Sequence, residues 1–258
     1  MMNSGSNKFG RRLRFCAVHL LISLALAASV FALVFFGWYP EPYWVIAGGH
    51  GLFWLLVAVD TVVGPMLTLV VAGPTKEGRE LKRDLAVIGL LQLAALCYGV
   101  YTIALARPVH LVFEIDRFRV VSAADVEVER LVDAPADLRG LSWTGPTLIA
   151  AVKPEDPDEL MRATELGLAG IDLSMNPKNW RDYRSHASLA WSRARKVSLL
   201  AAKYPEMTTP LDEIAQRAGV RLDDLRFLPL ASRHASWSVL LGDGGRRVVG
   251  YLPVDGFL

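Results

Sequence analysis

Three long apolar runs constrain this chain more than any other feature. Residues 15–36 and 85–106 contain no Asp, Glu, Lys or Arg, and residues 51–71 contain only Asp60. A helix needs roughly 20 apolar residues to cross a hydrocarbon core about 30 Å thick. The sequence therefore predicts a membrane protein with three transmembrane α-helices.

The first run has some features of a cleaved signal peptide. Its apolar part is longer than the usual signal core of about 7 to 15 residues, and Gly37-Trp38-Tyr39-Pro40 has no small-x-small cleavage pattern. We interpret it as an uncleaved signal anchor.

The basic residues near the ends of these runs predict an orientation. Four precede the first run and four follow the second, whereas the loop 37–50 contains none. They are Lys8, Arg11, Arg12, Arg14, Lys76, Arg79, Lys82 and Arg83. Because Lys and Arg near span ends stay in the cytoplasm, residues 1–14 are predicted to be a cytoplasmic tail and 15–106 a three-helix membrane module. Residues 107–258 then form a periplasmic domain of a multi-pass bacterial inner-membrane protein.

Aromatic residues gather in the loop between the first two runs. They are Trp38, Tyr39, Tyr43 and Trp44. Since Trp and Tyr are enriched at membrane interfaces, this cluster is predicted to lie at the outer surface of the bilayer.

Charge argues against a nucleic-acid partner. The whole chain has a net charge of +2, and residues 107–258 carry 20 Lys and Arg against 21 Asp and Glu, a net of −1. Binding to nucleic acid through bulk charge needs a basic domain or stripe. The small basic excess belongs to the membrane module, where it sets the topology.

Residues 107–258 have the pattern of a mixed α+β domain. Strands are predicted at 109–115, 118–122 and 148–152, with a hairpin of 236–241 and 246–252 around Gly242-Asp243-Gly244-Gly245. Helices are predicted at 156–166, 185–203 and 211–218, and loops at 134–146 and 175–179.

Asp60 is the single residue that the sequence most strongly indicates as functional. A carboxylate inside a span costs about 2.5 to 3.5 kcal/mol at the centre, so it normally faces the bundle interior or a watery cavity. It lies roughly 14 Å below the outer end of its span, and Ser23, Gln92 and Tyr98 lie within about one helical turn of that depth. These three residues are therefore its predicted hydrogen-bond partners. Two roles stay open: a hydrogen-bonded residue that packs the helices, or a contact with a polar group of another membrane protein.

Gly64-Pro65 follows Asp60 by one turn. Proline frees a backbone carbonyl and tends to kink a helix, and glycine allows close approach. The pair is predicted to shape the helix, and beside Asp60 it could form a groove for a docking helix.

The remaining motifs indicate no enzyme, metal or cofactor site. The two cysteines, Cys16 and Cys97, lie in apolar runs, and the five histidines lack the spacing of a metal pair. There is no G-x-S-x-G elbow or phosphate loop. Residues 211–225 look like the start of a helix-turn-helix, but their predicted location outside the cytoplasm argues against a DNA-reading role.

The first half of the chain resembles the type IV pilin accessory protein family. The matching residues lie within about 14–130, and the last of them lie in and after the strand predicted at 109–115. They are His19-Leu20, Ser23, Trp38-Tyr39-Pro40, Asp60, Gly64-Pro65, Leu67-Thr68-Leu69, Asp84-Leu85, Gln92, Tyr98-Gly99, Arg107-Pro108, Phe113 and Asp116-Arg117-Phe118. We expect Arg107-Pro108 to mark the exit from the membrane.

The resemblance implies an inner-membrane accessory protein with no defined catalytic activity. Such a protein would bind or stabilise type IV pilin in a chaperone-like way and modulate pilus assembly or surface display. Its implied partners are the pilin transmembrane helix, the pilin periplasmic head, the bilayer and other components of the assembly machinery. The alternatives are a membrane-anchored periplasmic sensor, which would need a ligand pocket and a cytoplasmic output, and a membrane enzyme, which would need clustered polar residues at one interface.

Overall fold

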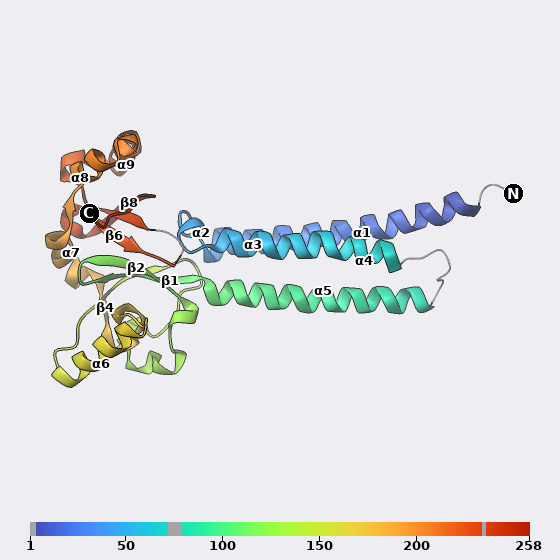
Figure 1. The fold of residues 1–258 in the computed structure, drawn as a ribbon, viewed down its shortest axis with the longest axis horizontal. Helices are drawn as coiled ribbons and strands as arrows, with labels where there is room; N and C mark the ends of the chain where they lie inside the picture. Colours follow the sequence, from blue (N-terminus) through green and yellow to red (C-terminus); the bar gives the residue numbers. More distant parts are fainter. Residues whose placement is uncertain (1–3, 72–78, 234–235) are drawn as a thin grey trace. The chain divides into compact units, whose positions relative to one another are not determined.

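A computed structural model describes residues 4–71, 79–233 and 236–258. The chain forms two compact units (Figure 1). Unit 1 is Met1–Trp38 with Gly49–Leu105, and unit 2 is Tyr39–Gly48 with Ala106–Leu258. The chain therefore passes between the units three times.

Unit 1 consists of long apolar helices. They are α1 (Ser4–Ala32), continued by the π-helical η1 (Leu33–Trp38); α3 (Gly49–Ala58), η2 (Val59–Val63, also π-helical) and α4 (Gly64–Val71) in one continuous run; and α5 (Arg79–Ala106). Three stretches are long and apolar enough to cross a membrane: Ala17–Trp38, Gly49–Val71 and Arg79–Ala106. The three predicted apolar helices are confirmed. From Ser4 onward the predicted tail is part of α1. Lys76 and His234 lie outside the described residues.

Aromatic and small residues hold these helices together. The ring of Phe53 on α3 lies 5.6 Å from that of Phe31 and 5.2 Å from that of Phe35, centroid to centroid. A Cβ on Gly99 of α5 would lie 2.4 Å from Cδ1 of Leu56 on α3, so α5 approaches α3 closely at that glycine. Unit 1 is therefore a packed bundle.

Unit 2 is built on one mixed sheet in the order β4-β3-β1-β2-β6-β7-β8, with β5 paired to β6. The strands are β1 (Pro108–Glu114), β2 (Arg117–Ser122), β3 (Thr147–Ala151), β4 (Trp180–Asp182), β5 (Arg195–Lys196), β6 (Arg226–Ala231), β7 (Trp237–Gly242) and β8 (Arg247–Leu252). The β1–β3 and β2–β6 pairs are parallel and the others antiparallel.

Helices cover both faces of this sheet. They are α2 (Tyr43–Ile46), α7 (Ala187–Arg193), α8 (Ser198–Lys203) and α9 (Thr208–Ala218), whereas α6 (Pro157–Leu168) has no buried residue. Successive strand residues face opposite sides, and accordingly Leu241 packs in a core cluster with Ala187 and Ala190 of α7, whereas Leu240 packs in another with Leu211 of α9.

Local signals in the sequence explain where two of the helices begin or end. The Asp156 side chain accepts hydrogen bonds from the backbone N–H groups of Asp158 and Glu159, and Pro157 occupies the first turn of α6. Gly219, with a φ of 68°, ends α9 in the left-handed conformation.

Most of the predicted elements of unit 2 are confirmed, including the strands at 109–115 and 118–122, the hairpin of 236–241 and 246–252, and the helices near 156–166 and 211–218. The single helix predicted at 185–203 is wrong. Its residues form a 3₁₀ turn (Tyr183–His186), α7, β5 and α8, because Ala194 is extended and the next two residues pair with β6. In the helix-turn-helix-like sequence, residues 211–225, α9 is followed by a 3₁₀ turn (Leu222–Asp224), and β6 comes next.

The loop between the first two apolar helices belongs to unit 2. Ile46 is fully buried in the same core cluster as Leu228 and Val239, and the Tyr43 hydroxyl lies 2.5 Å from that of Tyr251 on β8. Tyr39 is also fully buried. Protein therefore covers the rings of Tyr39 and Tyr43, while their position at the outer surface of the bilayer stays a prediction.

Candidate functional site

The candidate site lies in unit 1, at a π-helical turn in the second apolar helix. This turn, η2, contains Asp60 and ends directly before Gly64 and Pro65. An α-helix would bond the carbonyl of Thr61 to the N–H of residue 65, but proline has no N–H. At this position the structure has a π-turn, a feature that often occurs at functional sites.

Polar side chains from α1 surround Asp60. The Asp60 carboxylate accepts a hydrogen bond from the hydroxyl of Ser23 and interacts electrostatically with His19. Nδ1 of His19 lies 2.6 Å from Oγ1 of Thr68 on α4. Ser23 and Thr68 are both buried. Hydrogen bonds between polar side chains thus join α1 to the second apolar helix.

Gln92 brings α5 into the same group. A Cβ on Gly64 would lie 1.7 Å from Nε2 of Gln92, so the amide occupies the space that glycine leaves. Both amide atoms of Gln92 are buried, and within the described part of the chain neither has a hydrogen-bond partner. We define His19, Ser23, Asp60, Thr68 and Gln92 as the polar cluster.

Two cavities meet at the polar cluster. One, of about 100 Å³, is lined by His19, Ser23, Asp60 and Gln92 together with apolar side chains. The other, of about 170 Å³, is lined by Asp60, Gln92, Gly64 and apolar side chains of the second and third apolar helices. Asp60 and Gln92 therefore face space into which another polar group could enter.

The predicted partners of Asp60 differ in their placement. Ser23 contacts it and Gln92 shares its cavities, but Tyr98 is 73% exposed on α5. Tyr98 is therefore not one of the residues that pack the bundle, because equal depth along a helix does not fix which side of the helix a residue faces. Gly64 and Pro65 are both buried.

Arg107 and Pro108 lie in unit 2. Arg107 is buried, its Nε donates to the carbonyl of Ser142 at 3.1 Å, and its guanidinium carbon lies 3.9 Å from the centroid of the Trp143 ring. Burial lowers the pKa of Arg107, and its interaction with Tyr39 opposes this shift. Pro108 begins β1. These two residues anchor the start of the sheet.

The described residues contain no group of three or more His, Cys, Asp or Glu side chains that could hold a metal ion. Cys97 is a free thiol on an exposed position of α5.

Known proteins place the chain in a family. The family model of the fimbrial assembly protein FimB matches residues 7–48. A fimbrial assembly protein of serogroup I from Dichelobacter nodosus is 34% identical over 246 residues, which cover 93% of this chain and 94% of that protein. The chain belongs to the fimbrial assembly protein family. This confirms the resemblance to type IV pilin accessory proteins, and the names of the relatives support a role in pilus biogenesis.

Other family members extend the match. A serogroup E1 protein of Dichelobacter nodosus is 32% identical over 93% of this chain and 94% of its own length. A protein of serogroups C1 and C2 is 43% identical over 117 residues, which are 45% of this chain and 89% of that protein. The two longer relatives therefore align with residues of both units, and the family model spans His19, Ser23 and the segment 39–48. No solved structure matches the chain.

Proposed function

We propose that this protein is an inner-membrane accessory protein of type IV pilus biogenesis that binds the transmembrane helix of pilin at the polar cluster. Its three apolar helices would cross the membrane with the N-terminus in the cytoplasm, which leaves unit 2 in the periplasm. The eight basic residues that flank the spans on one side support this orientation.

The observation that carries the proposal is the pair Asp60 and Gln92, which face the same two cavities. A carboxylate in hydrocarbon is costly, and a buried amide without a partner adds to that cost. A polar group on an entering helix would satisfy both side chains, and Gly64 leaves the space in which the Gln92 amide lies beside Asp60. The cluster therefore has the chemistry of a docking site for a helix that carries a polar residue.

Pilin fits this role in shape. Before assembly it is a single membrane helix with a periplasmic head, so an accessory protein needs a docking face in the bilayer and a domain outside it. Unit 1 would supply the first, and unit 2 would contact or shield the head in a chaperone-like manner. Other components of the assembly machinery are possible further partners. No catalytic step, cofactor or nucleic acid enters the proposal.

Surface pili and total pilin, measured in cells that carry single variants, test the proposal. Asp60→Asn, Ser23→Ala and Pro65→Ala should reduce surface pili or pilin level and weaken crosslinking of the protein to pilin. Ser29→Ala is the matched control for Ser23→Ala, because Ser29 lies on α1 in an exposed position, and among the described residues its hydroxyl donates to the carbonyl of Ala25 alone. Unchanged piliation and crosslinking in the cluster variants would show that pilin does not dock there. Deletion of the gene, followed by measurement of surface pili and total pilin, distinguishes this role from that of a sensor or an enzyme.

A further inference from the structure

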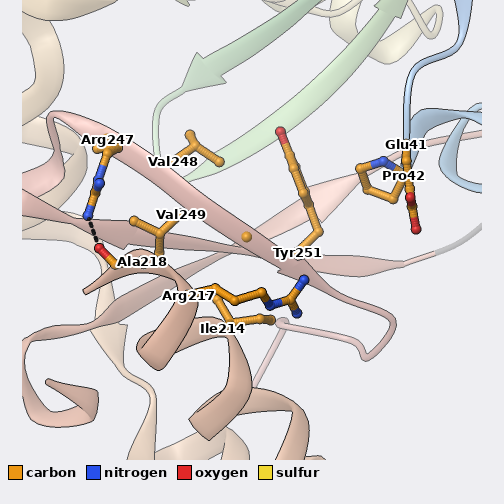
Figure 2. Close-up of a pocket in the computed structure, with 10 residues that line it drawn as sticks. Glu41, Pro42, Ile214, Arg217, Ala218, Arg247, Val248, Val249 and Tyr251 are labelled. Carbon is orange, nitrogen blue, oxygen red and sulfur yellow. Dashed lines mark hydrogen bonds between the residues drawn. The ribbon is translucent and has the colours of Figure 1, made fainter. Parts of the chain in front are cut away.

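A second site lies in unit 2, beside the outermost strand of the sheet. A cavity of about 470 Å³ opens between β8 and α9 (Figure 2). In the sheet order β8 is at one end, and in the described part of the chain it pairs with β7 alone. Its outer edge therefore carries backbone N–H and C=O groups that no further strand covers.

The cavity follows the edge of β8 and not one face of the sheet. Five consecutive residues of the strand, Arg247 to Tyr251, all line it. Successive residues of a strand point to opposite faces, so a cavity over one face would be lined by alternate residues. We call this cavity the β8 groove.

The walls of the β8 groove are fixed by packing. On one side, Ile214, Arg217 and Ala218 of α9 line it, and a Cβ on Gly250 would lie 2.8 Å from Cγ2 of Ile214. An Arg247 Nη2 donates to the carbonyl of Ala218 at 2.9 Å, which ties the start of β8 to the end of α9.

The other end of the groove is formed by the segment 39–48. Figure 2 shows Glu41 and Pro42 beside Tyr251, at the end of the strand away from Arg247. The hydroxyl contact between Tyr43 and Tyr251 holds this segment against β8. The groove is thus closed at one end by a segment that lies between the two apolar helices in the sequence.

The charged side chains of the groove differ in their partners. Nε of Arg247 lies 3.1 Å from a carboxylate oxygen of Asp243. Nε of Arg217 donates to the carbonyl of Glu213 in its own helix at 3.4 Å, and among the described residues no carboxylate lies within 4.0 Å of its guanidinium. Among the described residues, Arg217 therefore has no ion-pair partner within 4.0 Å, and Glu41 is the acidic side chain among the residues that line the groove with it.

We propose that the β8 groove binds an extended segment of a partner protein, which adds a strand to β8 and places an acidic side chain against Arg217. Addition of a strand to an exposed edge uses the main-chain hydrogen bonds of the peptide, while side-chain pockets give specificity. Here the charge of Arg217 selects an acidic residue, and the walls formed by Val249 and Ile214 accept an apolar neighbour.

The groove favours a single strand over a second copy of this chain. α9 forms one wall, and a second copy would bring its own α9 to the same edge. The register shift at Leu240 and Leu241 also gives β8 one extra residue, Val249, which interrupts a long regular ladder. The site therefore suits a short segment. The proposal does not depend on pilin docking at the polar cluster.

Site-specific photocrosslinking of the full chain in pilus-forming cells tests the proposal. A photoreactive amino acid is placed at Glu41 in one variant and at Ala218 in another, and the adducts are mapped by mass spectrometry. The five lining residues of β8 span about 17 Å at about 3.3 Å per residue. The two positions should therefore mark one partner segment at sites about five residues apart, with an Asp or Glu between or beside them.

Charge reversal provides the second arm. Arg217→Glu should reduce the adduct by about tenfold, because like charges would then oppose each other in the groove, and a Lys in place of the mapped acid should restore it. Arg162→Glu on the exposed surface of α6 is the matched control and should leave the adduct unchanged.

Several results would overturn the proposal: adducts only with lipid or with a second copy of the chain, two sites about eleven residues apart as in a helix, equal loss with Arg162→Glu, or no adduct at either position. Since these results concern unit 2 alone, they are independent of the piliation phenotype of the polar-cluster variants.

Discussion

The side-chain amide of Gln92 fills the space where a Cβ of residue 64 would stand, with Nε2 only 1.7 Å from that position. Gly64→Ala must therefore move this amide. Because the displaced atoms are the far end of a flexible side chain, we expect the bundle to fold but to lose about 1 to 3 kcal/mol, the usual cost of overpacking. Thermal unfolding of the full protein in detergent micelles measures the loss.

A double-mutant cycle isolates this contact. In a Gln92→Ala background the amide is gone, so Gly64→Ala should cost much less than it does in the natural chain. Equal costs in the two backgrounds would contradict the packing of Gln92 against Gly64. Gly89→Ala on α5 is a suitable control, because nothing lies within 4 Å of a Cβ at that position.

Ile46 tests whether the loop between the first two apolar helices is part of unit 2. Ile46 is 0% exposed and packs in the core, whereas its neighbour Val45 is 37% exposed. We expect Ile46→Ala to destabilise unit 2 by about 2 to 5 kcal/mol through loss of buried methyl groups and the cavity left behind. Val45→Ala should change stability by less than about 0.5 kcal/mol.

Hydrogen exchange of the β6 and β7 amides is the measurement for this pair. Ile46→Ala should speed their exchange and Val45→Ala should not. Equal exchange in the two variants would show that residues 39–48 are not needed to hold the sheet together.

The apolar helices could be predicted from the sequence because length and lack of charge are local properties. The same holds for the hairpin of β7 and β8 and for α9, which end at residues that adopt positive φ. The break at Ala194 could not be predicted, because it depends on the pairing of Arg195 and Lys196 with β6, a strand some 30 residues later in the chain.

The candidate site was predictable only in part. An aspartate in an apolar run can be recognised from the sequence alone. The rise per residue of a helix gives the depth of residues on the other helices, and this predicted Ser23 and Gln92 as neighbours of Asp60. Depth does not give the rotation of a helix, and so Tyr98 was misplaced. The contact of His19 with Thr68 and the π-turn of η2 required coordinates. The β8 groove was missed, because Glu41 and Arg217 are 176 positions apart and only the fold brings them to one cavity.

Two adjacent glycines in the turn between β7 and β8 provide a matched pair. Both have positive φ, 66° at Gly244 and 89° at Gly245. A Cβ on Gly244 would meet nothing within 4 Å, but one on Gly245 would lie 2.3 Å from the carbonyl oxygen of Ala187 on α7. Gly244→Ala should therefore cost about 1 to 2 kcal/mol from backbone conformation alone.

Gly245→Ala carries the same backbone cost and a clash with backbone atoms that cannot rotate away. We expect a further loss of about 1 to 3 kcal/mol, measured as a lower urea midpoint of the full protein. The hydroxyl of Tyr183 donates to the carbonyl of Gly245 at 2.6 Å, so the clash would also disturb this bond. A smaller effect at Gly245 than at Gly244 would contradict the packing of the turn on α7.

His110 should make the stability of unit 2 depend on pH. It is 1% exposed, its ring centroid lies 4.5 Å from that of Trp180, and its Nδ1 lies 2.6 Å from Oγ1 of Thr147. Oγ1 of Thr147 also lies 3.4 Å from the carbonyl oxygen of Val109. Nε2 of His110 is buried without a partner among the described residues. Burial accordingly lowers the pKa of His110 from 6.5 to about 4.

Between these two pKa values the unfolded chain binds the proton and the folded chain does not, so the stability that neutral His110 provides is complete above about pH 6.5 and is lost as the pH falls toward 4. From about pH 7.5 to about pH 5 the loss should be about 2 kcal/mol. His110→Gln should remove this part of the pH dependence, whereas His186→Gln, at a half-exposed histidine, should leave it in place. Urea unfolding at the two pH values measures the difference. A natural chain and a His110→Gln variant with the same pH dependence would show that His110 is not held neutral in the fold.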